Sequence, residues 1–532
     1  MLSDLRMFVA LLMAACSALG VPADVLRVNT WNIWRGGREN GVDSGPKQVI
    51  DLMKQSRSDV ILVQETYGSG ELIAKGLGYH ALYRGTNVSL YSRYPIEEDI
   101  SVNEPFNCVG GIIKMPSGQQ VAVFSIWLPY AADIWVPGVR AKTDLSQMLA
   151  ACQPSERVIT QMLQQIDQRL SDQKYANIPI IIGGDFNSMS HLDYTEVARE
   201  YYDRPVSWAT SKAMTSAGYR DSFRESNPIV DRAADRTWSP RFPEQEQDRI
   251  DFVYYRGIGL STVKSERIDS FGPLFPSDHA AVVSEIRVDP QFKKPKTIQI
   301  QAATYNIRHG AGMDDRLDLA RSVNAIKALR SDVIALQEMD DRTNRTNKQN
   351  QTAVIAKQLN MHSAFGNFMA YDGGYYGLSI LSKFPIVDTY PIRLPDGGEP
   401  RVALVADVRL PNNDVVSVVN VHFDWLGDDA NRFRQASLLA EALRKFKTPF
   451  ILMGDFNDGP DSRTLKLFKA VAEEAIKKKG STNTFPADKP TKEIDYIFAG
   501  PNSKWSLGTA NVVPEKVASD HRPVRATLTL TD

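Results

Sequence analysis

Two sets of acidic, amide and histidine side chains lie in the same order along the chain. In the second half, Glu338 closes an apolar run, Asp455 and Asn457 follow another in Asp-Phe-Asn, and Asp520 and His521 stand in Ser-Asp-His. Carboxylate and amide oxygens at strand ends suit Mg2+, which prefers oxygen ligands and keeps several waters. Phosphoester cleavage needs a positioned water, a base and positive charge near phosphorus. The set therefore predicts metal-assisted phosphoester hydrolysis.

The first half of the chain repeats these landmarks, and such long-period self-similarity indicates a duplicated domain. Residues 58–65 and 331–338 are short apolar runs that both end in Gln-Glu, and both are typical of buried strands with a carboxylate at the mouth. Amphipathic stretches at 317–329 and 430–443 alternate with the strands, which is an α/β pattern. The matched pairs are Asn32 with Asn306, Glu65 with Glu338, Asp185 with Asp455, Asn187 with Asn457, Asp251 with Asp495, Asp278 with Asp520, and His279 with His521.

These motifs, in this order and found twice, resemble those of the endonuclease/exonuclease/phosphatase superfamily of DNase I-like proteins. The resemblance covers nearly all of both halves. It implies an α/β (α+β) fold class with two tandem four-layer αββα sandwiches, each with its site in a cleft at one edge. It also implies Mg2+ as the metal ion, with Mn2+ as an alternative.

The resemblance assigns a role to each matched position. Asp455 would orient or deprotonate the attacking water, Asn457 would contact the phosphate, and His521, oriented by Asp495, would bind phosphate or act as acid or base. His422 matches an additional active-site histidine of the DNase I and sphingomyelinase branches, where it would stabilise the phosphate or assist the leaving group. The implied catalytic residues are Asp185, Asn187, Asp251, His279, His422, Asp455, Asn457, Asp495 and His521. The implied metal ligands are Asn32, Glu65, Asp278, Asn306, Glu338 and Asp520.

The first copy departs from the pattern at one position, because Trp127 stands where His422 falls in the second copy. Two hypotheses follow: both domains hydrolyse phosphoesters, or only the second is catalytic and the first is a substrate-binding or structural module. An insertion between Trp127 and Ile178 borders the predicted cleft and is a candidate specificity loop. Arg401 precedes a strand-like run and either reaches an anionic substrate or forms a structural ion pair.

The N-terminus predicts export. A basic residue, an apolar run and a small-residue site predict a signal peptide at 1–23, which indicates a secreted or periplasmic protein. Residues 13–16 also resemble a bacterial lipoprotein site, which would instead leave Cys16 lipidated. The first domain is predicted at 24–288, a polar, Pro-bearing linker at 289–297, and the second domain at 298–532. The mature chain has no apolar run long enough to span a membrane.

The amino-acid composition indicates the substrate class only in part. The chain carries 62 Lys and Arg against 63 Asp and Glu, without a long block of one charge, so no strongly positive surface for nonspecific DNA binding is indicated. The predicted partner is a phosphoester of open class: nucleic acid, phospholipid head group or inositol phosphate. Besides Cys16, only Cys108 and Cys152 remain, which allows one disulfide. The oligomeric state stays open.

Overall fold

The computed structural model describes residues 24–130, 134, 136–477 and 482–531, so the predicted signal sequence and Cys16 lie outside the described residues. The chain divides into two compact units. One holds the chain up to Asp193 together with Val206–Lys294, and the other holds Tyr194–Pro205 and the residues from Pro295 onward. The domain limits 24–288 and 298–532 stay predictions, although the division after Lys294 falls inside the proposed linker.

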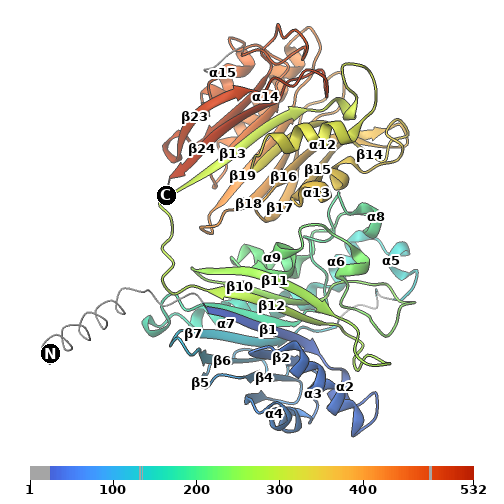
Figure 1. Cartoon of the computed structure of the whole chain (residues 1–532), viewed down its shortest axis with the longest axis vertical. Helices are drawn as coiled ribbons and strands as arrows, with labels where there is room; N and C mark the ends of the chain where they lie inside the picture. Colours follow the sequence, from blue (N-terminus) through green and yellow to red (C-terminus); the bar gives the residue numbers. More distant parts are fainter. Residues whose placement is uncertain (1–23, 131–133, 135, 478–481, 532) are drawn as a thin grey trace, which may run out of the picture. The chain divides into compact units, whose positions relative to one another are not determined.

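Each unit contains two six-stranded sheets of mixed direction (Figure 1). In the first unit, one sheet has the order β11 (Leu260–Ile268), β12 (Ala281–Val288), β1 (Asp24–Asn32), β2 (Val60–Gln64), β4 (Val88–Ser92) and β3 (His80–Arg84). The other has the order β5 (Ile96–Asp99), β6 (Cys108–Lys114), β7 (Gln120–Trp127), β8 (Ile180–Asp185), β10 (Asp251–Arg256) and β9 (Arg220–Asp221).

The second unit repeats this arrangement strand for strand along its central strands. Its first sheet has the order β15 (His362–Tyr371), β16 (Gly374–Ser382), β14 (Val333–Asp341), β13 (Thr297–Asn306), β24 (Val524–Thr531) and β23 (Trp505–Val512). Its second sheet has the order β17 (Ile386–Arg393), β18 (Val402–Arg409), β19 (Val415–His422), β20 (Phe450–Asp455), β22 (Asp495–Gly500) and β21 (Glu473–Glu474).

Helices connect and cover the sheets. In the first half of the chain they are α2 (Trp34–Gly37), α3 (Ser44–Ser56), α4 (Gly70–Leu77), α5 (Val139–Lys142), α6 (Leu145–Ala151), α7 (Gln153–Arg169), the 3-10 turn η1 (Gln173–Tyr175), α8 (Arg199–Tyr202), α9 (Ala209–Ser216), α10 (Ser222–Ser226) and α11 (Arg232–Asp235). In the second half they are η2 (Arg308–Gly310), α12 (Leu319–Ala328), α13 (Gln351–Leu359), α14 (Ala430–Leu443), α15 (Arg463–Lys469) and η3 (Asn502–Lys504). No helix of the described residues has the length and apolar character needed to cross a membrane.

The alternation of side chains along β7 shows how the four layers form. Val121 and Val123 face the other sheet and belong to the apolar core between the two sheets. Ala122 and Phe124 point the opposite way and pack against α7 in a second core. Successive strand residues face opposite sides, so one buried strand serves two cores. A third core joins α3 and α4 to the outer face of the first sheet, and the predicted sandwich is confirmed.

The second unit is layered in the same way. Its inter-sheet core includes Ala335 and Val418, and a further core packs α14 and α15 against Val419 and Leu452 of the second sheet. The helix α13 packs on β14 and β15 of the first sheet. The stretches predicted as helices around 317–329 and 430–443 form α12 and α14. Cys108 and Cys152 are both buried free thiols rather than a disulfide.

A glycine precedes Asp185 and Asp455 because two strands approach closely at these positions. Gly454 has a φ of +154°, and a Cβ at this position would lie 2.0 Å from the carbonyl oxygen of Val421 on the parallel strand β19. At Gly184 a Cβ would lie 2.1 Å from the carbonyl oxygen of Ile126 on β7. The close approach therefore excludes any side chain at these two positions.

We expect Gly454→Ala to destabilise the second unit by about 2 kcal/mol, the usual size of an overpacking effect. The added methyl group must push β19 and β20 apart at the point where they carry His422 and Asp455. Calorimetric unfolding would measure the change. Gly459→Ala is the matched control, because no heavy atom lies within 4 Å of a Cβ at that position. Unfolding at the same temperature for both variants would contradict this account.

Candidate active sites

Strand register alone brings the predicted residues of the second unit to one edge. On the second sheet, Asp455 pairs with His422 of the parallel strand β19 and with Asp495 of the antiparallel strand β22. On the first sheet, Asn306 ends β13 opposite Gln337, the residue before Glu338. The first unit repeats the register, with Asp185 between Trp127 and Asp251. Each cluster therefore lies where the ends of both sheets meet.

One asparagine in each unit links the two sheets across this edge. Nδ2 of Asn306 donates to Oε1 of Glu338 at 3.0 Å and to Oδ2 of Asp455 at 3.2 Å. In the first unit, Nδ2 of Asn32 donates to Oε1 of Glu65 at 3.2 Å and to Oδ2 of Asp185 at 3.0 Å. Each asparagine is buried at the end of its strand. The amide therefore holds the predicted metal ligand and the predicted base at a set separation.

The predicted metal ligands have the chemistry of an oxygen-donor cation site. Burial, and then the charge of Asp520, raises the pKa of Glu338. In the first unit, burial and the charge of Glu65 raise the pKa of Asp278 to about 6. Two carboxylates that share a site disfavour each other's charge, and a divalent cation between them relieves that repulsion. These residues therefore fit a hard divalent cation such as Mg2+.

Backbone strain recurs at the same positions in both units. Glu65 and Glu338 have φ values of +57° and +58°, in the left-handed region that residues other than glycine rarely occupy. Asn187 and Asn457 share the feature, with φ values of +45° and +50°. Residues held in such conformations cost about 1 to 3 kcal/mol each and gather at functional sites. The duplication of the strain indicates that it serves the site.

In each unit a buried histidine lies between two aspartates, hydrogen-bonded to one and within ion-pair distance of the other. Nδ1 of His521 lies 3.0 Å from Oδ2 of Asp495, and its Nε2 lies 3.6 Å from Oδ2 of Asp455. Burial lowers the pKa of His521, but the two carboxylates outweigh burial and raise it to about 10. Burial raises the pKa of Asp455 to about 7, against the effect of His521. His521 therefore holds a proton at neutral pH, beside an acid that titrates near neutrality.

The first unit repeats this arrangement. Nδ1 of His279 lies 3.0 Å from Oδ2 of Asp251, and its Nε2 lies 3.9 Å from Oδ2 of Asp185. The carboxylates raise the pKa of His279 well above its usual value despite burial, and burial raises that of Asp185 to about 7. These three side chains also offer ligand atoms within 4.8 Å of one another, as do Asp455, Asp495 and His521. We interpret both groups as proton-transfer chains, because the carboxylates hold the histidines in the charged form, which does not bind metal.

A second imidazole faces Asp455 in the second unit only. Nε2 of His422 lies 3.5 Å from Oδ2 of Asp455, and Nδ1 lies 3.3 Å from Nη1 of Arg401. Because a guanidinium only donates, Nδ1 must accept, and the ring proton sits on Nε2. Burial, Arg401 and His521 lower the pKa of His422 well below its usual value. Arg401, whose role the sequence left open, forms an ion pair with Glu399 at 2.9 Å and holds a neutral His422 with its N–H toward the site.

The equivalent place in the first unit is aromatic. Trp127 occupies the position of His422, and its ring lies 5.4 Å from the ring of Phe106, edge to face. The segment that follows Trp127 contains α5 and α6 ahead of α7, and α7 stands between β7 and β8 as α14 stands between β19 and β20, so the inserted part is α5 and α6. Arg140 of α5 forms a buried ion pair with Asp248, three residues before Asp251. This ion pair attaches the predicted specificity insertion to the strand that carries Asp251.

Several supporting residues escaped the sequence prediction. Thr237 Oγ1 accepts hydrogen bonds from the backbone N–H groups of Ile250 and Asp251, and Thr484 Oγ1 accepts one from Ile494. The residue after each threonine is aromatic, and its ring centroid lies 5.0 Å from that of the active-site histidine: Trp238 with His279, and Phe485 with His521. A Thr-aromatic pair ahead of each Ile-Asp motif was the signal that could have revealed them.

The predicted phosphate contacts Asn187 and Asn457 are held at the rim. Nδ2 of Asn457 donates to the carbonyl oxygen of Phe423 at 3.1 Å, and its backbone N–H donates to Oδ1 of Asp455 at 2.9 Å. Nδ2 of Asn187 donates to the carbonyl oxygen of Leu128 at 2.9 Å. These bonds tie each asparagine to the loop after the preceding strand. They place the side chains beside the aspartates, as the motif predicts.

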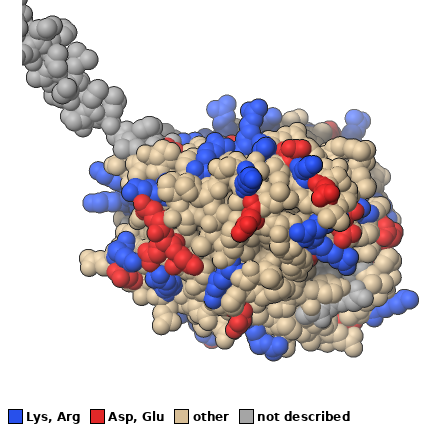
Figure 2. Space-filling view, turned by 90° about the horizontal axis from the view of Figure 1, so that it is seen from below, with Lys and Arg blue, Asp and Glu red and all other residues tan. Residues whose placement is uncertain are grey.

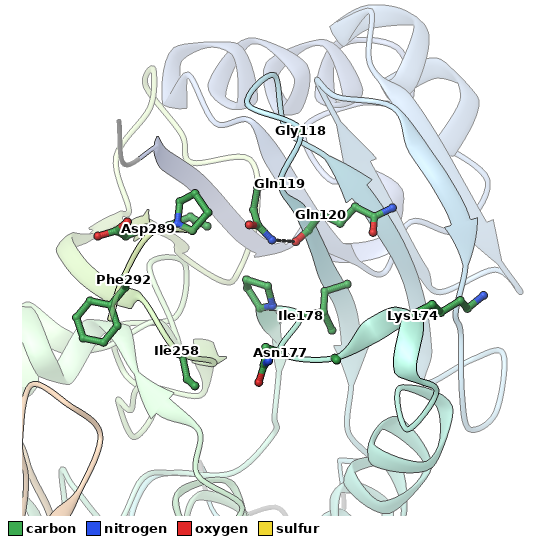
Figure 3. Close-up of a pocket in the computed structure, with 13 residues that line it drawn as sticks. Gly118, Gln119, Gln120, Lys174, Asn177, Ile178, Ile258, Asp289 and Phe292 are labelled. Carbon is green, nitrogen blue, oxygen red and sulfur yellow. Dashed lines mark hydrogen bonds between the residues drawn. The ribbon is translucent and has the colours of Figure 1, made fainter. Parts of the chain in front are cut away.

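A hollow of about 500 Å³ in the first unit is separate from this site (Figure 3). Its lining includes Gln119, Gln120 and Lys174. Gln120 begins β7 whereas Trp127 ends it, which puts the hollow about 20 Å away at the opposite edge of the sheet. Nε2 of Gln119 donates to the carbonyl oxygen of Gln120, and Lys174 pairs with Glu98. The hollow therefore holds none of the predicted catalytic groups.

The family to which the chain belongs follows from its sequence. The model of the Endonuclease/Exonuclease/phosphatase family matches residues 30–279 and 303–521, which is most of both units. The chain belongs to this family. The match in two regions agrees with the repeat of motifs and with two DNase I-like sandwiches.

Individual relatives match about one unit each. An uncharacterized protein of Caenorhabditis elegans is 26% identical over 291 residues, which cover 49% of this chain and 90% of the relative. The uncharacterized protein YbhP of Escherichia coli K12 is 27% identical, covering 43% of this chain and 95% of the relative. An endonuclease/exonuclease/phosphatase from Bacteroides vulgatus of known structure is 22% identical, covers 44% of this chain and 99% of its own, and has a TM-score of 0.38.

We expect Asp495→Asn to lower the pKa of His521 from about 10, because it removes the largest of the charges that oppose the effect of burial. In the wild type the raised pKa stabilises the fold fully below about pH 6.5, and this contribution is lost as pH rises through about 10. Histidine NMR of the metal-free chain would show a charged His521 at pH 8 in the wild type and a lower pKa for His521 in the variant. Asp251→Asn is the control, which should move only His279. A neutral wild-type His521 at pH 8 would contradict the assignment.

We expect Arg401→Met to let His422 adopt both neutral tautomers, because Nδ1 loses the guanidinium donor that makes it accept a hydrogen bond. Nitrogen-15 shifts of His422 should show Nε2–H alone in the wild type and a mixture in the variant. Hydrolysis at the second site should fall at the same time, since the N–H no longer faces Asp455 in every molecule. A single Nε2–H tautomer in both proteins would show that Arg401 does not fix the tautomer of His422.

Proposed function

We propose that the protein is a Mg2+-dependent phosphoesterase that hydrolyses phosphodiester or phosphomonoester bonds by in-line attack of an activated water. The observation that carries the proposal is the arrangement around Asp455, which has a charged imidazole, His521, and a neutral one, His422, on either side. A base with a pKa of about 7 flanked by two N–H donors matches what phosphoryl transfer requires.

The metal ion would be held by Glu338 with Asn306 and Asp520, and by Glu65 with Asn32 and Asp278 in the first unit. When bound, Mg2+ would supply positive charge beside the phosphate. Mn2+ prefers similar oxygen donors and is the alternative ion. The support is the chemistry of the donors together with the repulsion that burial leaves between the paired carboxylates.

The side chains of the site would supply the base and the hydrogen-bond donors. Asp455 accepts a proton from the attacking water and holds it on Oδ2. Protonated His521 donates from Nε2 to a phosphate oxygen, while Asp495 keeps its ring oriented through Nδ1. Neutral His422 donates from Nε2 to the phosphate or to the departing oxygen. Preorganised donors of this kind need no rearrangement as charge builds on the phosphate.

The first unit would use the same frame, with Asp185 as base and His279 held by Asp251. It lacks the imidazole at position 127. The alternative is that the first unit binds substrate or serves the structure, and that only the second turns substrate over. The intact bridge from Asn32 to Glu65 and Asp185 favours an active first site, because it holds the same groups as in the second unit.

The surface charge bears on the substrate, and the N-terminal sequence bears on the location of the protein. Basic and acidic side chains are interspersed on the face shown in Figure 2, without a broad area of one sign. This face therefore offers no extended positive surface of the kind that binds a long polyanion. We propose export to the periplasm or the medium from the signal-like N-terminus, with the lipid anchor on Cys16 as the alternative.

We expect hydrolysis of bis-p-nitrophenyl phosphate, plasmid DNA, RNA, sphingomyelin or an inositol phosphate to require Mg2+ and to stop with EDTA. Asp455→Ala should lower turnover at the second site by at least about a hundredfold, because it removes the base. His521→Ala should do the same.

Asp185→Ala is the matched variant for the first unit. If it also removes a separate share of the activity, the first site is catalytic. If only Asp455→Ala has an effect, the first unit is a binding or structural module. A folded wild-type chain that hydrolyses none of these substrates with Mg2+ or Mn2+ would end the hydrolase proposal.

A further inference from the structure

At three matched positions around the two sites, the first unit has an aromatic side chain and the second has a basic one. Counting along the paired strands, Trp127 corresponds to His422 and Phe106 to Arg401. The contacts repeat this match, since each pair of side chains meets: Phe106 with Trp127 and Arg401 with His422. At all of these positions, the first unit has a ring where the second has a basic side chain.

The third position follows the bridging asparagine. The backbone N–H of Trp34 donates to Oδ1 of Asn32, and that of Arg308 donates to Oδ1 of Asn306, both at 3.0 Å. Arg308 lies 3.8 Å from Asp520, a predicted metal ligand. Trp34 instead stands edge to face with Phe242 at 5.7 Å. At this position the second site has a guanidinium and the first has an indole, over whose ring the guanidinium of Arg241 lies at 5.3 Å.

We propose that the two sites select different phosphoesters: the first a singly charged phosphodiester bearing a planar aromatic group, the second a compact, doubly charged phosphomonoester. This inference rests on the proposed function. A dianionic phosphate needs more donors and positive charge than a diester. At the three matched positions the second unit supplies them through Arg308, Arg401 and His422, while Arg308 also pairs with Asp315 and Arg401 with Glu399. The first unit offers ring surface instead, which suits stacking.

Exposure supports the assignment. Phe106 is 40% exposed and Trp127 is partly exposed, so their rings are open to a ligand. Arg401 is 1% exposed and His422 4%, so this pair acts from within the site. Along β7, Trp127 follows Ser125 and Val123 on the inter-sheet face, at the edge where Asp185 lies. Arg35 adds a cation to the first site, but its side chain is 70% exposed and pairs with Glu39.

Three substrates with one leaving group test the selectivity: p-nitrophenyl phosphate, methyl p-nitrophenyl phosphate and bis-p-nitrophenyl phosphate. The full chain with Asp455→Ala reports on the first site, and the chain with Asp185→Ala reports on the second. We expect the first site to show a KM about tenfold lower for the bis-aryl than for the methyl diester, the size of one good ring contact. We expect the second site to prefer the monoester.

Binding tests the inference without turnover. Calorimetric titration of the Asp455→Ala chain with diphenyl phosphate should show about tenfold tighter binding than with dimethyl phosphate. Adding Trp127→Ala should remove this difference, and adding Phe106→Ala should reduce it. Phe106 is 40% exposed, so its variant keeps the fold if Trp127→Ala unfolds. Leu82→Ala, on β3 of the same unit, is the control that should leave the difference unchanged.

The outcomes separate the two proposals. Equal affinity for diphenyl and dimethyl phosphate, or a preference that survives both ring variants, overturns the selectivity. A ring-dependent preference in binding without hydrolysis by the Asp455→Ala chain supports the selectivity and removes catalysis from the first unit. Hydrolysis by both sites with the same substrate preference overturns the selectivity and leaves the hydrolase proposal standing.

Discussion

The hydrogen bonds from one buried asparagine amide determine the geometry of each site. Asn306 ends a strand of one sheet, yet its Nδ2 reaches both Glu338 on its own sheet and Asp455 on the other. Ser519 Oγ in turn donates to the carbonyl oxygen of Asn306 at 2.7 Å, which ties the Ser-Asp-His segment to the same residue. Asn32 and Ser277 repeat the arrangement in the first unit. The sheets must therefore meet at this edge in one register for the charged groups to converge.

A second buried side-chain amide, that of the glutamine before each glutamate, also fixes the register between the two sheets. Nε2 of Gln337 donates to Oδ1 of Asn420 across the sheets at 2.7 Å, and Gln64 makes the corresponding bond to Ser125 Oγ at 3.1 Å. A buried amide left unpaired would cost about 1 to 3 kcal/mol, so a slip of one sheet over the other is penalised. Gln-Glu in the motif thus has two tasks: the glutamine sets the register of the sheets, and the glutamate enters the site.

The two units show how one frame can hold different chemistry. The Asp-Asp-His group, the asparagine bridge and the left-handed glutamate recur almost unchanged, because each depends on strand ends that the fold holds in place. The neighbouring positions vary, because Trp127 or His422 can occupy the end of the equivalent strand without moving Asp185 or Asp455. The second unit has basic groups near the phosphate position and the first has aromatic rings, so different substrates would fit. The groups that would cleave the phosphoester stay in the same place in both units.

The sequence by itself determined the duplication and the sandwich class, and it predicted the residues that converge at one edge of each unit. Those signals are local, since Asp-x-Asn begins on the last residue of its strand and Ser-Asp-His stands just before the last strand of its unit. Only the tertiary structure decided the contacts made between strands. Arg401 and His422 are 21 residues apart, and Phe106 and Trp127 are equally far apart, so neither pair has a spacing that reveals it. Their meeting depends on antiparallel register, which is set by long-range packing of two sheets rather than by any short motif.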